Sequence, residues 1–479
     1  MSGETRFLVK TLGCKANFAD GQSLEGNLIA RGFKTAHSIE GADLVIVNSC
    51  TVTDEAEQQS RKWIRDAKKR NPNIRVLYTG CGAEVDPDAA LGVSGIGAVL
   101  GNQNKHQAGE LISRWMERPA GEPEVLGTVS AYRELASRHP MDREWPGAEQ
   151  GAIPLNPLPE EASSFRTRAF LKIQEGCDSF CTYCVIPYGR GPARSLSIDS
   201  VTRRINDLVA QGVREVVLTG TNIGDFGVDR GGAPQVDDLI EQILTRTSLE
   251  RLRIGSLDPV EISPRMLSLL DQFPAFCPHF HVSLQHTETR ILKLMKRKYA
   301  LEQIESLFDR ISTLKRRPFI GMDVIVGFPG ETEDDFLKME ERLGSWQWNR
   351  LHVFPYSERT GTPATRLPLS VPRHLRKERA RRLQMKSLER LTRLHAASGL
   401  RSQGEGGVLR GVLLEGSVKG PDESRRWVSG YSPDYQRVLL PESVLGKWGR
   451  NDVIDVRVAR WIVDRTHGEV SWIGEPHGS

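Results

Sequence analysis

Short apolar runs alternate with longer amphipathic stretches over residues 1–118 of the chain. The apolar runs predict strands at Phe7–Thr11, Leu44–Val47 and Val76–Tyr78. Between them, polar and apolar residues recur at helical spacing and predict helices over Ser23–Ala30 and Glu55–Arg70. Strands and helices that alternate in this way predict a doubly wound α/β domain with a parallel sheet.

The same rhythm returns over residues 166–395. The predicted strands are Ala169–Gln174, Glu215–Thr219, Leu252–Ser256, His279–Leu284, Phe319–Val326 and Leu351–Phe354. The helices predicted between them include Ile198–Gln211, Asp237–Thr245 and Leu301–Thr313. Repeated strand–helix units predict a partial (βα)6 barrel of the TIM type, whose active site lies at the carboxyl ends of the strands.

Two other segments follow different patterns. Residues 119–165 are rich in Pro, Glu, Gly and Ser, which predicts a linker or an irregular insertion. Residues 396–475 contain short β-type runs between turns, which predict a small β-barrel. These runs are Val408–Leu414, Trp427–Tyr431, Arg437–Leu440 and Val453–Trp461.

Composition sets limits on this picture. At ~100–200 residues per domain, a chain of 479 residues predicts two to four domains. The net charge is only +4, so any nucleic-acid site is expected to be a local patch. No apolar run reaches the ~18 residues of a membrane span, and the N-terminal residues lack a signal-peptide pattern. Seven cysteines do not suggest a secreted disulfide framework. We therefore expect a cytoplasmic protein with no membrane partner.

Three of the cysteines, Cys177, Cys181 and Cys184, form a Cys-x3-Cys-x2-Cys run. Cysteine thiolates ligate iron–sulfur clusters, and three of them leave one iron of a cuboidal cluster open. A zinc site is the alternative, but it would need a fourth Cys or His at similar spacing. The run follows the strand-like Ala169–Ile173 and resembles the radical S-adenosylmethionine (SAM) enzymes. That resemblance implies that the open iron binds the amino and carboxylate groups of SAM.

Three single cysteines, Cys14, Cys50 and Cys81, each follow a predicted strand of the first domain. Ligands of open α/β sheets bind beyond the carboxyl ends of the strands, so these side chains are expected to converge. They predict a second three-cysteine cluster site, with buried structural cysteines as the alternative. The remaining Cys277 has no cysteine at ligand spacing and is interpreted as structural.

A bound SAM needs close approach of the backbone, which glycine permits. Glycine-containing strand ends occur at Leu218–Asn222, Ile254–Pro259 and Asp323–Glu331, all after the cysteine run. The candidate SAM-binding residues are Tyr183, Thr219, Gly220, Asn222, Ser256, Asp258, Asp323 and Gly327.

The order of these parts resembles the radical SAM methylthiotransferases over nearly the whole chain except the 119–165 segment. The resemblance implies two [4Fe-4S] clusters: one on Cys14, Cys50 and Cys81 for sulfur delivery, and one on the Cys177 run that cleaves SAM. A second SAM donates the methyl group, and the 5′-deoxyadenosyl radical abstracts the hydrogen that the methylthio group replaces. The C-terminal segment resembles the TRAM module, an RNA-binding barrel. Implied partners are tRNA, a flavodoxin- or ferredoxin-type electron donor and a sulfur donor.

The residues around Cys14 help to choose among the branches of this family. Thr11–Asn17 reads Thr-Leu-Gly-Cys-Lys-Ala-Asn, which resembles the branch that modifies C2 of N6-threonylcarbamoyladenosine beside the tRNA anticodon. Isopentenyladenosine in tRNA and an aspartate of a ribosomal protein are the alternative acceptors. The chain departs from the family at Ala16, at Asp258, where Glu is usual, and at Gln285–Glu288, where Gln-Ser-Gly-Ser is usual.

Basic and aromatic residues near the C-terminus are candidates for RNA contact, because such groups neutralise phosphates and stack on bases. The stretch Arg373–Arg401 is basic and helix-permissive, although a charge run is often only a solvated helix face. The candidate RNA-binding residues are Arg376, Arg379, Arg382, Tyr431, Tyr435 and Arg437.

Two other functions remain as alternatives. Asn104–Gly109 weakly resembles a cobalamin-binding motif, but Asn stands in place of its Asp and the strand-end cysteines would then have no role. An iron–sulfur protein that binds RNA and senses redox state, without catalysis, is the non-enzymatic alternative. The glycine-rich strand ends argue against it.

Overall fold

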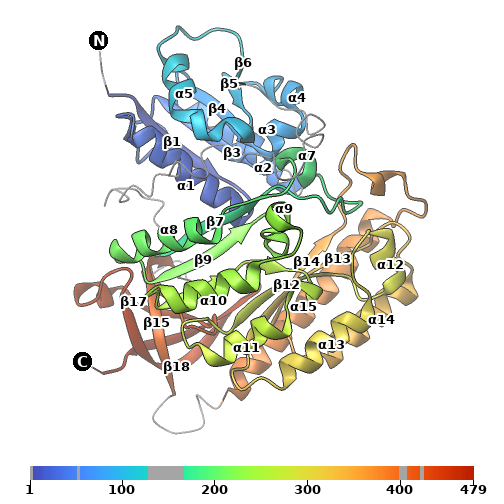
Figure 1. Ribbon diagram of the computed structural model, residues 1–479. Helices are drawn as coiled ribbons and strands as arrows, with labels where there is room; N and C mark the ends of the chain where they lie inside the picture. The colour runs from blue at the N-terminus through green and yellow to red at the C-terminus, as the bar shows by residue number, and fades with distance from the viewer. Residues whose placement is uncertain (1–3, 51–53, 128–166, 399–406, 421–425, 479) are drawn as a thin grey trace.

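The computed structural model describes residues 4–50, 54–127, 167–398, 407–420 and 426–478 (Figure 1). Most of the expected linker, residues 119–165, lies outside these ranges. Within them, no helix combines the length and apolarity needed to cross a membrane.

The N-terminal domain is a parallel sheet with the strand order β2-β1-β3-β4-β5-β6. Its strands are β1 (Arg6–Thr11), β2 (Lys34–Thr35), β3 (Leu44–Ser49), β4 (Arg75–Gly80), β5 (Ala98–Leu100) and β6 (Glu124–Leu126). The predicted strands appear as β1, β3 and β4. The last strand, β6, lies beyond residue 118, because its buried Leu126 extends the apolar sheet within the expected linker.

Helices cover this sheet, and they include α1 (Lys15–Ile29), α2 (Asp54–Arg70), α3 (Cys81–Val85), α4 (Pro87–Leu91), η1 (Asn102–Gln107) and α5 (Ala108–Met116). The first begins at Lys15, eight residues before the predicted start at Ser23. Gly13 turns the chain with φ of 101°, a conformation that favours glycine, and Cys14 is then the N-cap residue. Gly21 fits inside the helix because a Cβ there would lie 2.2 Å from Thr11 Oγ1.

The central domain is a six-stranded parallel arc, as predicted. Its strands are β7 (Arg168–Glu175), β9 (Glu215–Gly220), β10 (Arg251–Ile254) with β11 (Ser256–Leu257), β12 (His279–Gln285), β13 (Phe319–Val326) and β14 (Arg350–Pro355). The hydrogen bonds divide the arc into β10-β9-β7-β8 and β11-β12-β13-β14. The third strand, predicted as continuous, is interrupted at Gly255, whose N–H bonds to Leu218 O. The short β8 (Arg194–Ser195) pairs antiparallel with β7, which the sequence pattern did not predict.

Helices surround this arc on its outer side (Figure 1). They are α8 (Ile198–Ala210), α9 (Val228–Gly231), α10 (Val236–Arg246), α11 (Pro264–Gln272), α12 (Thr289–Leu294), α13 (Leu301–Ser312) and α14 (Glu333–Ser345), with the short η3 (Ile223–Asp225), η4 (Pro259–Glu261) and η5 (Pro363–Arg366). The short α7 (Ile186–Arg190) instead packs against α3 of the N-terminal domain. The basic helix α15 (Arg373–Ala397) packs against β14. One apolar core joins the outer faces of the strands to these helices.

The C-terminal segment forms a closed barrel with the order β15-β16-β17-β19-β18, in agreement with the predicted small β-barrel. Its strands are β15 (Val408–Lys419), β16 (Arg426–Tyr431), β17 (Arg437–Pro441), β18 (Val453–Asp464) and β19 (Glu469–Pro476), with η6 (Glu442–Gly446) after β17. The sequence pattern did not predict β19. Trp472 of β19 is fully buried in the barrel core. In Figure 1 the blue N-terminal domain lies above β7 and β9, and the red C-terminal barrel lies below them.

Candidate active site

The loop that carries Cys177, Cys181 and Cys184 follows β7 and leads into α7. Gly176 begins it with φ of 75°, where a Cβ would lie 2.0 Å from Pro192 O. Backbone N–H groups then donate to two of the sulfurs: Ser179 N lies 3.4 Å from Cys177 Sγ, and Ile186 N lies 3.4 Å from Cys184 Sγ. The loop therefore places two of the three sulfur atoms beside N–H donors, and hydrogen bonds of this kind help to set the reduction potential of an iron–sulfur cluster.

The electrostatics of these thiols fit an iron–sulfur cluster. Burial raises the pKa of Cys177 to about 11 and that of Cys184 to about 12. Thiolate at neutral pH would therefore need a cationic partner, which iron supplies. No group of three His, Cys, Asp or Glu side chains in the described ranges can hold a single metal ion. A cuboidal cluster has no such requirement, because each cysteine ligates a different iron.

Arg297 extends this site, and sequence analysis did not predict it. Its Nη1 donates to Cys181 Sγ at 3.1 Å, its Nη2 donates to Asp258, and its Nε donates to Tyr299 Oη at 3.1 Å. The side chain is almost fully buried, at 8% exposure. Arg297 thus connects the cysteine loop to a candidate SAM-binding carboxylate. It comes from the segment after α12, far away in sequence, so no local motif could have revealed the contact.

Cys14, Cys50 and Cys81 each follow a parallel strand at its carboxyl end, as predicted. Cys14 is exposed, whereas Cys50 and Cys81 are buried. A Cβ on Gly13 would lie 2.6 Å from Cys50 Sγ, so glycine is needed for this close approach. Cys14 also lies within electrostatic range of Cys81. The structure brings these three side chains together at one edge of the sheet.

The two cysteine sites face each other across α3 and α7. Cys81 begins α3, and α7 follows directly after the Cys184 loop. A Cβ on Gly189 would lie 3.4 Å from Cys81 Cβ, which places the helices in close contact. Asn102 Nδ2 fixes the same helix by donating to Gly189 O at 2.6 Å. The geometry therefore joins a cysteine site of each domain in one region.

A buried ion network fastens the two domains beside this region. Asp20 of α1 contacts Lys105, Lys172 and Arg190, and Glu175 contacts Lys172 and Arg190. Burial alone would raise the pKa of Asp20, but these three cations hold the pKa well below its usual value. Burial would also raise the pKa of Glu175, but Arg190 and Lys172 outweigh this effect and lower the pKa to about 2. Both carboxylates are therefore charged at neutral pH.

The turn after β9 that carries the candidate Asn222 is held by the side chain of Gln174. Gln174 Oε1 accepts from Thr221 N at 3.0 Å and from Asn222 N at 2.8 Å. A Cβ on Gly220 would lie 2.8 Å from Gln174 O, so the turn needs glycine there. Thr219 is buried in the same strand. Gln174 was not predicted, although its inward position on the first strand is a usable signal.

His281 connects two further candidates on neighbouring strands. Its Nδ1 lies 2.6 Å from Ser256 Oγ, and its Nε2 lies 3.1 Å from Asp323 Oδ1. Asp258 caps η4 together with Glu261, whose Oε2 accepts from Asp258 N at 2.7 Å. Burial and the nearby Asp258 raise the pKa of Glu261 to about 8.

The last two SAM candidates, Gly327 and Tyr183, lie side by side with Phe328. Gly327 has φ of 71°, and its N–H donates to the buried Glu331 at 2.8 Å. The Tyr183 and Phe328 rings meet edge to face, with their centroids 6.3 Å apart. Most of the candidate ligands thus lie at or after the carboxyl ends of the strands, while Asp323 lies within β13 and Tyr183 within the cysteine loop. Their contact with SAM stays a prediction.

The predicted RNA-binding residues of α15 mostly face the barrel. Arg376 and Arg379 are buried: Arg376 donates to Val371 O and Tyr356 O, and Arg379 contacts Glu331 and Glu333. Arg382 is half exposed and contacts Glu340. The periodicity of the sequence did not distinguish the buried arginines of α15 from its exposed arginines, because the same residue type occurs on both faces of the helix.

Tyr431, Tyr435 and Arg437 lie where the C-terminal barrel meets the amino-terminal ends of the central strands. Tyr435 contacts the Tyr431 ring and the His279 ring, with centroids 4.9 and 4.3 Å away. Arg437 is bound to Glu469 at 2.5 Å. These side chains have partners inside the protein, and their contact with RNA also stays a prediction.

The unusual Gln285–Glu288 segment is closely held. Gln285 adopts φ of 58°, and His286 is completely buried with its Nε2 3.6 Å from Glu331 Oε2. Glu288 contacts Arg342 of α14. The segment that departs from the family pattern therefore packs against the Gly327–Glu331 turn through the contact between His286 and Glu331.

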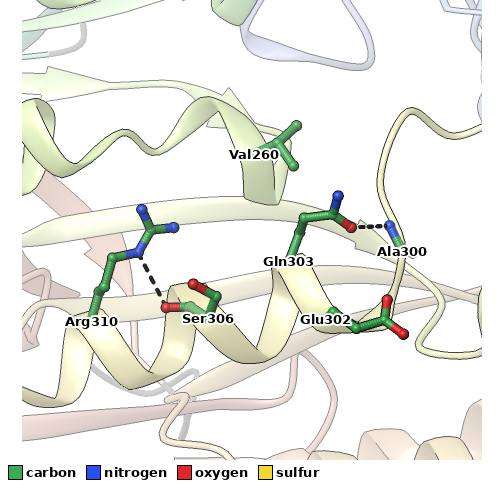
Figure 2. Close-up of a pocket in the computed structure, with 6 residues that line it drawn as sticks. All are labelled: Val260, Ala300, Glu302, Gln303, Ser306 and Arg310. Carbon is green, nitrogen blue, oxygen red and sulfur yellow. Dashed lines mark hydrogen bonds between the residues drawn. The ribbon is translucent and has the colours of Figure 1, made fainter.

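A separate cavity of about 380 Å³ lies on the outer side of the barrel, between η4 and α13 (Figure 2). Its lining residues are Val260, Ala300, Glu302, Gln303, Ser306 and Arg310. None of them is a predicted site residue. Gln303 and Arg310 are engaged in hydrogen bonds to their own helix or its N-terminus, as Figure 2 shows.

Comparisons with known proteins agree with this geometry. Residues 6–101 match the family described as Uncharacterized protein family UPF0004, and residues 171–343 match the Radical SAM superfamily. The threonylcarbamoyladenosine tRNA methylthiotransferase MtaB of Bacillus subtilis is 34% identical and aligns over 91% of both chains. The chain belongs to the radical SAM methylthiotransferase family. The cofactors of this family are two [4Fe-4S] clusters and SAM.

Other methylthiotransferases show how the family divides by acceptor. The enzyme of the same name from Aquifex aeolicus is 34% identical over 78% of this chain and 86% of its own. The tRNA-2-methylthio-N(6)-dimethylallyladenosine synthase of Syntrophomonas wolfei is 31% identical over 86% of this chain and 87% of its own.

The solved structure of the radical SAM methyltransferase TsrM from Kitasatospora setae, with tryptophan and a SAM analogue bound, resembles this chain in fold. The TM-score is 0.53, with 17% identity over 76% of this chain and 75% of that one. This similarity supports the radical SAM fold and carries no information on the acceptor.

Proposed function

We propose that this methylthiotransferase inserts a methylthio group at C2 of N6-threonylcarbamoyladenosine next to the anticodon of tRNA. The observation that carries the proposal is the meeting of two three-cysteine sites across α3 and α7, combined with the threonylcarbamoyl-type motif Thr11–Asn17. Relatives from Bacillus subtilis and Aquifex aeolicus that align over most of the chain are named for this reaction.

Cys177, Cys181 and Cys184 would hold the cluster on which SAM binds, and Cys14, Cys50 and Cys81 would hold the second cluster. When bound, the first cluster supplies the electron that cleaves SAM to methionine and the 5′-deoxyadenosyl radical. Arg297 holds Cys181 and Asp258 in fixed relation through its two Nη atoms. Gln174 orients the turn at Asn222, where the backbone can approach SAM.

The ion network of Asp20, Lys172, Glu175 and Arg190 keeps the two cysteine sites at a fixed separation. Such positioning is valuable in group transfer, because small misplacements of the reacting atoms cost much rate. The exposed Cys14 is the member of its site that lies open to an incoming acceptor.

For RNA binding, the exposed side of α15 is better supported than its buried side. Arg373, Lys377 and Arg381 are exposed, whereas Arg376 and Arg379 are committed to the barrel. Arg382 is half exposed on the same helix, whereas Tyr431, Tyr435 and Arg437 contact partners inside the protein. Exposed cations on one helix face suit the phosphate backbone. We also propose a cytoplasmic location, a flavodoxin- or ferredoxin-type electron donor and a separate sulfur donor.

The proposal is tested by nucleoside mass spectrometry on bulk tRNA from a strain that lacks the protein. Loss of 2-methylthio-N6-threonylcarbamoyladenosine, with accumulation of the unthiolated nucleoside, is the expected result. Complementation with the unchanged chain should restore it, and complementation with Cys181→Ala should not. Loss of the methylthiolated isopentenyladenosine instead would overturn the assignment in favour of the second branch, which the Syntrophomonas wolfei relative represents.

A further inference from the structure

The inside of the central barrel contains several charged and titratable side chains. Alternate residues of a strand point to the same face, so each strand sends a polar series inward. Arg168, Glu215, Arg253, His281, Asp323 and His352 belong to this series. An interior of this kind can bind a polar acceptor if one of its charged side chains is not already paired within the protein.

Nearly every inward cation has a partner within the protein. Arg168 contacts Glu415 at 2.6 Å, and Arg253 contacts Glu215 at 2.7 Å. Arg253 also donates to Ser432 O and Pro433 O. Burial and the neighbouring His281 lower the pKa of His352 to about 4, so this ring is neutral at physiological pH.

Lys15 differs from these groups. It is the first residue of α1, which packs against β7 and β9, and its side chain lies within electrostatic range of Asp323, Arg168, Arg253 and Tyr435. Within the ranges that the structure describes, its ammonium group makes no hydrogen bond or ion pair. Asp323, the nearby carboxylate, is already engaged by His281. Lys15 is therefore a half-buried amine beside the charges of the barrel interior, without a dedicated anion. Its burial and the neighbouring Arg168 and Arg253 lower its pKa.

The position of Lys15 in the chain gives this cation a defined relation to the chemistry. It directly follows Cys14, the exposed cysteine of the sulfur-delivery site. The acceptor carbon C2 of adenine is separated from C6, which carries the modified N6, by N1 alone. Sulfur arriving at C2 and a group bound to the N6 substituent therefore act on the same edge of the base. The threonylcarbamoyl substituent ends in a carboxylate, whereas an isopentenyl substituent has no charge.

We propose that the Lys15 ammonium binds the carboxylate of the threonylcarbamoyl side chain and so selects this acceptor over an uncharged one. The inference rests on the proposed function and deepens it. A carboxylate would give the unpaired cation the partner that the protein does not provide, with a charge-assisted hydrogen bond. An uncharged substituent would cover the cation without pairing it, which is unfavourable in a partly buried site. Lys15 is thus a specificity-determining residue.

The test compares three anticodon stem-loop RNAs with the cluster-loaded enzyme. One carries N6-threonylcarbamoyladenosine, the second carries the same side chain as its primary amide, and the third carries isopentenyladenosine. Binding by fluorescence anisotropy and kcat/KM for methylthiolation are measured for the unchanged enzyme, Lys15→Gln, Lys15→Arg and the exposed control Lys69→Gln. Non-specific phosphate contacts cancel in the ratio between the first two RNAs.

The unchanged enzyme and Lys69→Gln should bind the carboxylate RNA about tenfold or more tightly than the amide RNA, as expected for a hydrogen bond to a charged group. Lys15→Gln should bind the two RNAs equally, and Lys15→Arg should retain part of the preference. Equal binding of both RNAs by the unchanged enzyme would overturn the inference, as would a full preference in Lys15→Gln.

The failure of this inference differs from failure of the proposed function. If the unchanged enzyme methylthiolates the carboxylate and amide RNAs alike, the proposed function stands and the role of Lys15 is wrong. If it modifies only the isopentenyl RNA, the proposed function itself is wrong. Should Lys15→Gln not load its clusters, judged by iron content, the unchanged enzyme and Lys15→Arg still decide the question by their carboxylate-to-amide ratios.

Discussion

The two three-cysteine sites are built in opposite ways. Cys177, Cys181 and Cys184 share one loop, where two backbone N–H groups and Arg297 donate to their sulfurs. Cys14, Cys50 and Cys81 come from three separate strand ends. In the part of the chain that the structure describes, no N–H donates to Cys14 Sγ or Cys81 Sγ.

This difference matches two different tasks. A site that tunes an electron transfer benefits from fixed donors around sulfur, because such donors set the reduction potential. A site that delivers sulfur must leave a face open, and Cys14 is exposed. The barrel site is thus defined by a local sequence, whereas the N-terminal site depends on the fold and on contact between domains.

The largest expected effect is the loss of a ligand from the barrel site. Cys181→Ala should lower SAM cleavage to 5′-deoxyadenosine by about a thousandfold or more, because the electron transfer that starts the reaction needs the intact cluster. Product quantification under reducing, anaerobic conditions measures this effect. Cys277→Ala, a buried cysteine outside both sites, is the matched control. SAM cleavage at the normal rate by Cys181→Ala would contradict the assignment of SAM cleavage to the cluster site of Cys177, Cys181 and Cys184.

The next effect concerns the network that joins the sites. Asp20→Ala should destabilise the protein by about 3–5 kcal/mol, because Lys105, Lys172 and Arg190 lose a buried partner. Chemical unfolding followed by fluorescence provides the measurement. Glu110→Ala, which removes only the exposed partner of Arg31 and Arg114, should cost about 0–1 kcal/mol. Equal costs would show that the interdomain network contributes no more than surface pairs.

A smaller effect separates the two clusters electronically. The Arg297 guanidinium donates to Cys181 Sγ, and this positive donor stabilises the more negative, reduced state of the cluster. Arg297→Leu removes the donor. The reduction potential of the barrel cluster should fall by about tens of millivolts, while that of the N-terminal cluster stays unchanged. A redox titration followed by electron paramagnetic resonance detects both signals in one sample. A shift of both potentials would contradict the separate construction of the two sites.

The last effect concerns protein stability and lies at Glu261, which accepts a hydrogen bond from Asp258 N beside the Asp258–Arg297 contact. Burial and the nearby Asp258 raise the pKa of Glu261 in the folded protein to about 8, from the usual 4.5 of a glutamate. The folded state keeps a proton there that the unfolded state loses, so stability should fall as pH rises between these two values. The slope from one such proton is at most about 1.4 kcal/mol per pH unit.

Glu261→Gln should remove this contribution and flatten the dependence of thermal stability on pH between about 5 and 8. The exposed Glu302→Gln provides the control. An unchanged slope in Glu261→Gln would mean that Glu261 is charged in the folded protein.

The features that depended on local sequence were predictable. The Cys177 loop, the strand ends that carry Cys14, Cys50 and Cys81, and the rhythm of the central strands all follow from short-range patterns. The start of α1 at Lys15 was missed, because Gly21 and the polar residues near it weaken the helical pattern although Thr11 requires the glycine.

Features that depend on tertiary contact were not predictable. Arg297 reaches Cys181 from a distant segment, and His281 connects Ser256 to Asp323 across neighbouring strands. Similarly, nothing local distinguishes the buried Arg379 from an exposed arginine of the same helix. A single sequence reports residue type and periodicity, whereas the partner of a charged side chain is set by the packing of several elements.

The division of labour between the two sites is tested most directly in Cys50→Ala. The cluster-loaded variant is incubated anaerobically with reductant, SAM and tRNA bearing N6-threonylcarbamoyladenosine, and 5′-deoxyadenosine and the methylthiolated nucleoside are quantified in the same sample. We expect continued formation of 5′-deoxyadenosine with no methylthiolated nucleoside, because the barrel site keeps all three of its cysteines. Full methylthiolation by Cys50→Ala would contradict the assignment of sulfur delivery to the N-terminal site.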